Sequence, residues 1–153
     1  MQRRLIPLLG LAALLATLPA EAAKCPRGTL TGIVTYVRDG DTIEVGTMPI
    51  RLNGLAAPEG DEPGGAEATR GMLELVQGRT LRCELDGDRT HDRCVGVCYL
   101  DDEDVAAVMV RRGLARDCER FSGGRYRAAE RQAAEDGATI RASYRLPGYC
   151  LPR

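Results

Sequence analysis

The chain has little of several residue types, and each shortage limits what the protein does. Its 153 residues include no tryptophan, one phenylalanine, one lysine and one histidine, His91. Cys94 and Cys98 are close enough in sequence to suggest a metal site, but such a site needs a second pair of cysteine or histidine ligands. The chain has one histidine and no second close cysteine pair, so disulfide bonding is favoured over metal binding. The formal net charge is −1, whereas proteins that wrap nucleic acid non-specifically are basic. Any contact with nucleic acid must therefore depend on a local cluster of arginines.

Long apolar runs are also missing, with one exception near the start of the chain. Residues 5–18 are almost entirely apolar and follow a positively charged start. The run is too short to span a bilayer comfortably, and an Ala-Glu-Ala cleavage signature ends at Ala22. We therefore expect residues 1–22 to be a signal peptide cut after Ala22, which predicts a secreted or periplasmic protein. An uncleaved anchor is the alternative, and no later stretch predicts membrane contact.

The remaining residues, 23–153, have the length of a single domain that buries a sizeable core. Removal of the signal peptide changes the formal net charge to −2. No repeat, linker or low-complexity segment divides this part of the chain. Nothing in it indicates a protein partner, and a monomer is expected.

Six cysteines follow the predicted cleavage site. They are Cys25, Cys83, Cys94, Cys98, Cys118 and Cys150. An even number in an exported chain predicts three disulfides, although 15 pairings are possible and free buried thiols are the alternative. The best single prediction is Cys118–Cys150, which would tie the C-terminal segment to the body. Of the middle three cysteines, one is expected to pair within their hairpin and another with Cys25.

The first half of the domain has the pattern of a β-meander. Residues 30–37, 42–45 and 49–53 are rich in β-branched residues or alternate in polarity, which predicts three strands. Asp39-Gly40 and Gly46-Thr47 are turn signals between them. A meander of this kind curls into a small barrel.

The rest of the domain adds helices and two more strands. Helices are predicted at 66–76, 104–112 and 126–136, and strands at 79–85 and 93–100 around a polar loop at 86–92. Asp101 or Asp102 is the expected N-cap of the second helix, and Gly113 its end. The order β-β-β-α-β-β-α-α predicts an α+β protein with a five-stranded OB-fold barrel and three helices.

Five short motifs in this order carry a family resemblance. They are Asp-Gly-Asp-Thr at 39–42, Arg-Leu at 51–52, Pro-Glu at 58–59, Asp-Arg at 92–93 and Val-Arg-Arg-Gly-Leu-Ala at 110–115. The chain resembles the thermonuclease (staphylococcal nuclease-like) family over roughly residues 28 to 138. The resemblance implies an OB-fold phosphodiesterase that acts on DNA or RNA. It also implies that Arg51 and Arg93 clamp the phosphate and that Glu59 orients or deprotonates the attacking water.

The resemblance further implies a calcium ion. Asp41 would be the metal carboxylate, Asp39 a nearby acid, and the backbone carbonyl of Ala57 a further ligand. Calcium suits such a turn because it takes hard oxygen ligands in irregular geometry.

One position departs from the family pattern: Ala56 stands where a second metal aspartate is expected. Loss of an anionic ligand weakens a divalent site, because ligand charge helps to set calcium affinity. Three outcomes remain: Asp61 or Glu62 supplies the missing oxygen, the site works with weakly bound calcium, or the chemistry has been lost.

The sequence therefore predicts an exported, metal-dependent nuclease, with a catalytically silent OB-fold module for nucleic acid or another anionic ligand as the alternative. A purely structural exported domain is a third reading. His91 is expected to be a solvated loop residue. Tyr126, Tyr144 and Tyr149 are expected to pack in the core or tail rather than to stack on bases.

Overall fold

The computed structural model describes residues 24–138 and 143–151. The predicted signal peptide and its cleavage after Ala22 lie outside these residues. Within them, no helix combines the length and apolar character that crossing a membrane requires.

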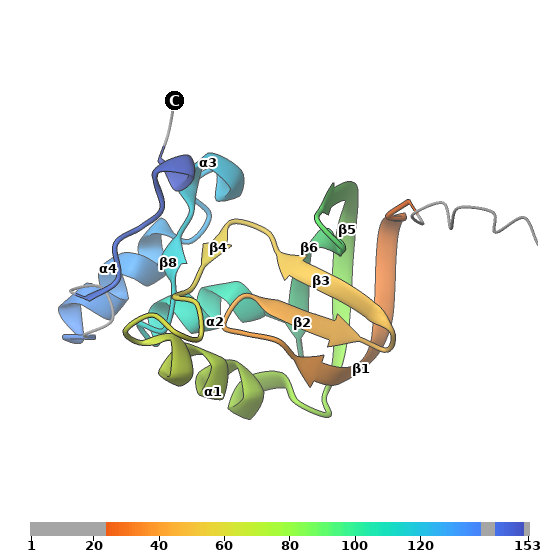
Figure 1. The fold of residues 1–153 in the computed structure, drawn as a ribbon, viewed down its shortest axis with the longest axis horizontal. Coiled ribbons are helices and arrows are strands. Elements are labelled where there is room, and N and C mark those ends of the chain that lie inside the picture. Colours follow the sequence, from red (N-terminus) through yellow and green to blue (C-terminus); the bar gives the residue numbers. More distant parts are fainter. Residues whose placement is uncertain (1–23, 139–142, 152–153) are drawn as a thin grey trace, which may run out of the picture.

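Five strands form a closed barrel (Figure 1). They are β1 (Arg27–Val37), β2 (Thr42–Val45), β3 (Met48–Leu52), β5 (Thr80–Thr90) and β6 (Arg93–Leu100). Antiparallel pairing runs through β3-β2-β1-β5-β6, and a parallel pairing of β3 with β6 closes the ring. The predicted α+β class with an OB-fold barrel is confirmed.

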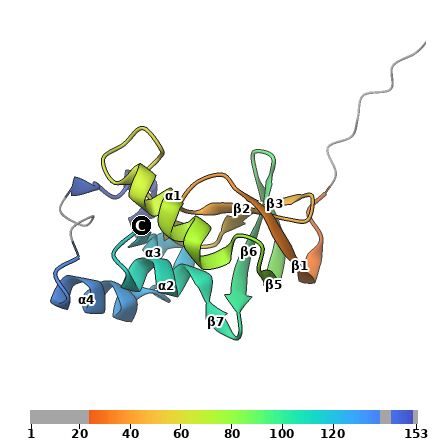
Figure 2. The ribbon, with the colours of Figure 1, turned by 90° about the horizontal axis from the view of Figure 1, so that it is seen from below.

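Helices and three short strands complete the described part of the chain. These elements are β4 (Leu55–Ala56), α1 (Gly65–Val76), β7 (Glu103–Asp104), α2 (Val105–Arg111), β8 (Arg116–Asp117), α3 (Glu119–Ser122), α4 (Arg127–Glu135) and the 3-10 turn η1 (Gly148–Cys150). Figure 2 shows the helices gathered at one side of the barrel. The core lies between them and the barrel, and its largest fully buried side chains include Ile43, Ile50, Met72 and Met109.

The structure corrects several predicted boundaries, and β1, for example, begins at Arg27 rather than at residue 30. Residues 86–90, predicted to be loop, belong to β5, where Asp86 pairs with Arg27 and Thr90 with Arg93. Polar residues continue the strand there because both neighbouring strands offer backbone partners. The N-cap of α2 is Asp104, not Asp101 or Asp102, and its side chain accepts hydrogen bonds from the amides of Ala106 and Ala107.

Short elements were the ones that the sequence pattern missed. β4, β7 and β8 contain two residues each and α3 contains four, too few for a periodic signal to develop. The pairing of β4 with β8 matters most for function, because it joins Leu55 and Ala56 to Asp117 and Arg116. This pairing connects the residues after β3 to the helical end of the molecule.

Three disulfides staple the domain: Cys25–Cys94, Cys83–Cys98 and the predicted Cys118–Cys150. The second joins directly paired residues of β5 and β6. The third connects the residue before α3 to η1, so the C-terminal segment lies beside α3 (Figure 1).

Candidate functional site

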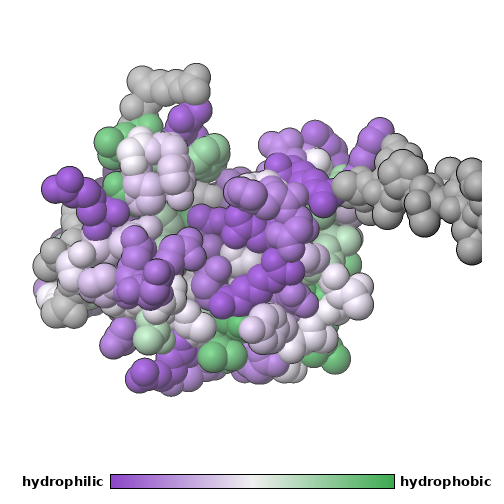
Figure 3. All heavy atoms as spheres, in the orientation of Figure 1, coloured by the Kyte–Doolittle hydropathy of each residue, from purple (hydrophilic) through white to green (hydrophobic). Residues whose placement is uncertain are grey.

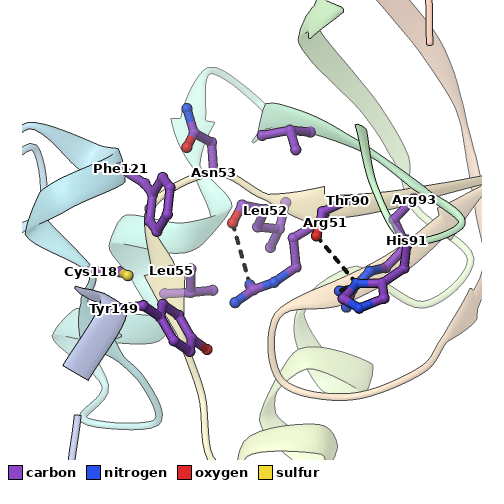
Figure 4. Close-up of a pocket in the computed structure, with 12 residues that line it drawn as sticks. Arg51, Leu52, Asn53, Leu55, Thr90, His91, Arg93, Cys118, Phe121 and Tyr149 are labelled. Carbon is purple, nitrogen blue, oxygen red and sulfur yellow. Dashed lines mark hydrogen bonds between the residues drawn. The ribbon is translucent and has the colours of Figure 1, made fainter. Parts of the chain in front are cut away.

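A pocket opens where β3, the β5–β6 turn and α3 meet (Figure 4). Its lining residues are Arg51, Leu52, Asn53, Gly54, Leu55, Thr90, His91, Arg93, Val95, Cys118, Phe121 and Tyr149. Arg51 lies across the middle in Figure 4, with His91 and Arg93 on one side and Phe121, Leu55 and Tyr149 on the other. The pocket thus combines two arginines with an apolar wall.

The turn between β1 and β2 buries Asp41 beside this pocket. The Asp39 carboxylate accepts a hydrogen bond from the Asp41 amide at 2.9 Å, which orders the turn. Gly40 is required because a Cβ there would lie 2.6 Å from the Cβ of Ala57 and 2.8 Å from that of Ala68. The turn can therefore press against the core and carry the Asp41 carboxyl inward.

Asp41 has three neighbours that satisfy its carboxyl oxygens. Arg51 Nη1 lies 2.8 Å from Oδ2, the Ala57 amide donates to Oδ2 at 3.3 Å, and Thr42 Oγ1 donates to Oδ1 at 3.0 Å. Burial raises the pKa of Asp41 to about 7, although the charge of Arg51 opposes the rise. Burial therefore makes this carboxyl harder to ionise than a solvated aspartate, and the ion pair with Arg51 favours its charged form.

The two arginines come from adjacent strands. Arg51 on β3 lies beside Val95 of β6 in the parallel pairing, two residues along β6 from Arg93. Arg93 Nη1 donates to Thr42 Oγ1 at 3.0 Å, so Thr42 connects Arg93 to Asp41 and hence to Arg51. Closure of the barrel therefore brings together three of the residues that the sequence predicted.

Arg93 differs from Arg51 in its pairing. Among the residues that the structure describes, Arg93 has no carboxylate within ion-pair distance, and its Nε is buried without a hydrogen-bond partner. A buried donor without an acceptor is costly. An incoming anion that realigned this guanidinium would satisfy it, and a phosphate offers acceptors in the right geometry.

Glu59 lies outside this group. It is exposed at the start of the loop before α1, and its amide donates to Glu62 Oε2 at 2.9 Å. Gly65 holds this loop close, since a Cβ at Gly65 would lie 1.7 Å from the Glu59 carbonyl oxygen. Glu59 does not line the pocket. Its predicted role on the water would require its carboxylate to turn toward a bound substrate.

Ala56 is buried, at 1% exposure, and does not line the pocket. It packs in a small cluster with Tyr144 and the Cys118–Cys150 disulfide. The space beside this position is therefore occupied by the C-terminal segment. Burial raises the pKa of Tyr144, and the charges of Glu62, Asp41 and Arg51 also act on its hydroxyl.

The described residues do not form a tight calcium site. Asp61 is exposed, and the Glu62 carboxylate is hydrogen-bonded to the Glu59 amide. No group of three or more histidine, cysteine, aspartate or glutamate side chains suited to a metal occurs in the described part of the chain. Of the carboxylates expected to bind the ion, Asp41 is buried and already pairs with Arg51, whereas calcium takes six to eight oxygens.

Sequence reasoning missed two groups of pocket residues. His91 is exposed in the turn between β5 and β6, as expected, but it also lines the pocket, with its Nδ1 3.3 Å from Thr90 Oγ1 and 3.4 Å from Arg93 Nη2. Phe121 and Tyr149 form part of the opposite wall. A signal for the second group was available, because the predicted Cys118–Cys150 bridge places the neighbours of both cysteines side by side.

Comparisons with known proteins agree with the fold. Residues 49–141 match the family model of staphylococcal nuclease homologues, which covers more than half of the chain. The succinoglycan biosynthesis protein ExoI of Rhizobium meliloti is 35% identical over 142 residues, covering 85% of this chain and 72% of that protein.

Two other relatives carry nuclease names. A probable staphylococcal-like nuclease of Oryza sativa subsp. japonica is 36% identical over 50% of this chain and 23% of its own length. An uncharacterized endonuclease of Haemophilus influenzae is 27% identical over 64% of this chain and 58% of its own length. The chain thus spans about a quarter of the rice protein and more than half of the bacterial ones. From the family match, the barrel and the ordered motifs, we conclude that this chain belongs to the staphylococcal nuclease homologue family.

Proposed function

We propose that this chain hydrolyses phosphodiester bonds in DNA or RNA. The observation that carries the proposal is that Arg51 and Arg93 line one pocket, and that Arg93 has no carboxylate partner among the described residues. Two guanidinium groups on one pocket match the charge and geometry of a phosphodiester. The nuclease names of relatives in the same family support this assignment.

The proposed chemistry assigns a separate task to each residue. Arg51 and Arg93 hold the phosphate and stabilise the charge that builds on its oxygens in the transition state. Glu59 accepts a proton from the attacking water as the new phosphorus–oxygen bond forms. The bond to the leaving oxygen then breaks, and that oxygen takes up a proton. The loop that carries Glu59 is exposed, so it can adjust when substrate fills the pocket.

The family is generally calcium-dependent, and a bound calcium would supply positive charge beside the phosphate. We propose that calcium binds weakly in this chain, with Asp41, the Ala57 carbonyl and Asp39 as the available oxygens. Arg51 competes with the ion for Asp41, because it lies 2.8 Å from the carboxyl. Asp61 is exposed and the Glu62 carboxylate accepts a hydrogen bond from the Glu59 amide, so the loop would have to adjust for either to contribute.

A cleavage assay tests the proposal. The oxidised protein is incubated with single-stranded DNA, and separately with RNA, in millimolar calcium or in chelator. Glu59→Gln keeps the size of the side chain and removes the base, so a loss of about 10²-fold to 10⁴-fold in cleavage rate is expected. Glu67→Gln, an acid in the first turn of α1 and outside the pocket, is the matched control. Cleavage that survives both chelator and Glu59→Gln would contradict the mechanism.

A catalytically silent binding module is the second candidate. Two observations favour it: Ala56 lacks a carboxylate, and Glu59 does not line the pocket. A module would bind oligonucleotide without cutting it, and Arg93→Ala would abolish that binding. Measurable turnover by the purified protein, absent from Glu59→Gln prepared identically, would exclude this candidate.

Export and a monomeric state complete the proposal. Three disulfides suit an oxidising compartment, and we propose that residues 1–22 direct the chain there before cleavage after Ala22. N-terminal sequencing of the protein recovered from medium or periplasm would test the cleavage site. Sedimentation of that material would test the monomer.

A further inference from the structure

Two aromatic side chains are exposed beside the arginines. Phe121 is 53% exposed and Tyr149 is 56% exposed, yet both line the pocket together with buried Leu55. Figure 4 shows the two rings on either side of Leu55, across the pocket from His91 and Arg93. Large aromatic rings left open beside cationic groups offer a flat surface to a ligand that is apolar at one end and anionic at the other.

The aromatic wall belongs to one of the hydrophobic parts of the molecular surface. Figure 3 shows mostly hydrophilic side chains over the face of the barrel, with hydrophobic ones along the lower edge and at the end formed by α3 and the C-terminal segment. Phe121, Tyr149 and Leu151 are the exposed large hydrophobic residues of that end. Of these, Phe121 and Tyr149 line the pocket.

The C-terminal segment is anchored firmly enough to hold Tyr149 in place. Cys150 is buried and bonded to Cys118, and the Cys150 amide donates to the Pro147 carbonyl at 2.9 Å. Farther back, Tyr144 packs against Ala56. A larger side chain at position 56 would compete with Tyr144 for this space. The small residue there thus accommodates the segment that carries Tyr149.

The backbone next to Phe121 is also held by close contacts, between the turn that follows β3 and the start of α3. Gly54 has a φ of 72°, and a Cβ there would lie 2.6 Å from the Cα of Ser122. The Gly54 carbonyl accepts a hydrogen bond from the Cys118 amide at 2.8 Å. The start of α3 is therefore held against the turn that follows β3, which places Phe121 beside Leu55 in the pocket wall.

We propose that the C-terminal segment is part of the substrate site, with Tyr149 stacking on a nucleobase whose phosphate lies between Arg51 and Arg93. This inference rests on the proposed action on nucleic acid. Stacking accepts any base, because every base has a π-face. Leu55 and Phe121 add apolar contact that does not depend on which base is present, so the site favours a base over no base.

Binding measurements test the inference separately from cleavage. The oxidised protein is titrated in a calorimeter with dAMP and with deoxyribose 5-phosphate, which has the same phosphate and no base. Both titrations are run in chelator. The wild type is expected to bind dAMP at least about tenfold more tightly, which corresponds to about 1.4 kcal/mol and lies within the range for one stacked base.

Substitutions of Tyr149 test whether this residue is responsible for the tighter binding of dAMP. Tyr149→Ala should bring the two affinities to within about twofold, while Tyr149→Phe, which keeps the ring, should retain the difference. Leu151→Ala is the matched control, because Leu151 is 55% exposed on the same segment and does not line the pocket. A purely structural role for Tyr149 would instead lower both affinities together.

The disulfide supplies an independent variant. Cys118→Ala with Cys150→Ala should reproduce the loss of base preference, provided that circular dichroism shows a folded barrel. Should that variant fail to fold, Tyr149→Ala decides the question alone.

The outcomes separate this inference from the proposed function. Equal wild-type affinities for the two ligands, or a preference that survives Tyr149→Ala, would overturn the inference and leave nuclease activity to its own assay. If the protein cleaves no nucleic acid but binds dAMP more tightly than deoxyribose 5-phosphate in a way that depends on Tyr149, the inference would be supported. The protein would then be a binding module and not a nuclease.

Discussion

The two sides of the pocket region differ in how complete they are. On the arginine side, Arg51 and Arg93 lie on paired strands and line the same pocket. On the carboxylate side, Asp41 is buried and paired with Arg51, Ala56 carries no charge, and Glu59 is exposed outside the pocket. The arginine side is arranged for an anion, whereas the carboxylate side lacks the oxygens that a tight divalent site needs.

This difference has a physical origin in the elements that hold each side. Backbone pairing of β3 with β6 positions the arginines, and such pairing tolerates little variation. The carboxylates stand on a turn and a loop, and no strand pairing holds Glu59, which is exposed. The C-terminal segment packs against Ala56 from the carboxylate side and reaches the pocket with Tyr149. The comparison therefore predicts strong dependence on the arginines and weak dependence on calcium.

The largest effect is expected at Arg51, which touches both sides. Arg51→Ala leaves the Asp41 carboxyl buried without its partner, and at a pH well above the Asp41 pKa of about 7, where this carboxyl is ionised, breaking such a pair costs about 3–5 kcal/mol. Denaturant unfolding measures the loss. Adding Asp41→Asn should recover part of it by removing the unpaired charge. A cost under about 1 kcal/mol for Arg51→Ala would show that the ion pair is not buried in solution.

Substitution of Arg93 tests the arginine side without breaking a buried ion pair. Arg93→Ala should lower kcat/KM on single-stranded DNA by about 10²-fold to 10³-fold, because one donor to the developing charge is removed. Stability should change little, since no carboxylate of the described residues pairs with Arg93. Arg82→Ala is the control, being a partly exposed arginine of β5 outside the pocket. Equal losses in the two variants would contradict the assignment.

Gly65 tests the carboxylate side through the backbone. Gly65→Ala places a Cβ 1.7 Å from the Glu59 carbonyl oxygen, so the loop must move. If Glu59 acts on the water, cleavage should fall by up to about 10²-fold, the cost of misplacing a reacting group by about 1 Å. Gly60→Ala is the matched control, because nothing lies within 4 Å of its added Cβ. Full activity in Gly65→Ala would separate Glu59 from catalysis.

The smallest effect concerns calcium. Ala56→Asp restores a carboxylate on the poorer side and should lower the calcium concentration for half-maximal cleavage by about tenfold. The same change buries a charge next to Tyr144 and the Cys118–Cys150 disulfide, so the melting temperature should fall. Calcium titration of cleavage and thermal unfolding measure the two effects. An unchanged calcium requirement would show that position 56 does not face the ion.

Much of the fold could be predicted from local patterns. The second and fifth barrel strands, at 42–45 and 93–100, have the predicted bounds, because alternation and flanking turn residues mark their ends. The continuation of β5 through Thr90 could not be predicted, since polar residues form strand there only with β1 and β6 beside them. Two-residue strands such as β4 have no periodicity to detect.

By itself, the sequence determined the fold class, the family motifs and the expectation of three disulfides, because periodicity, turn chemistry and cysteine number are local or compositional properties. Only the tertiary structure decided which side chains meet. Closure of the barrel brings Arg51, Thr42 and Arg93 together. The same closure buries Asp41, and this burial raises its pKa. The Cys118–Cys150 disulfide brings Tyr149 to the pocket. The positions of the two cysteines indicated that bridge, but the other contacts between residues far apart in the chain depend on how the whole domain packs.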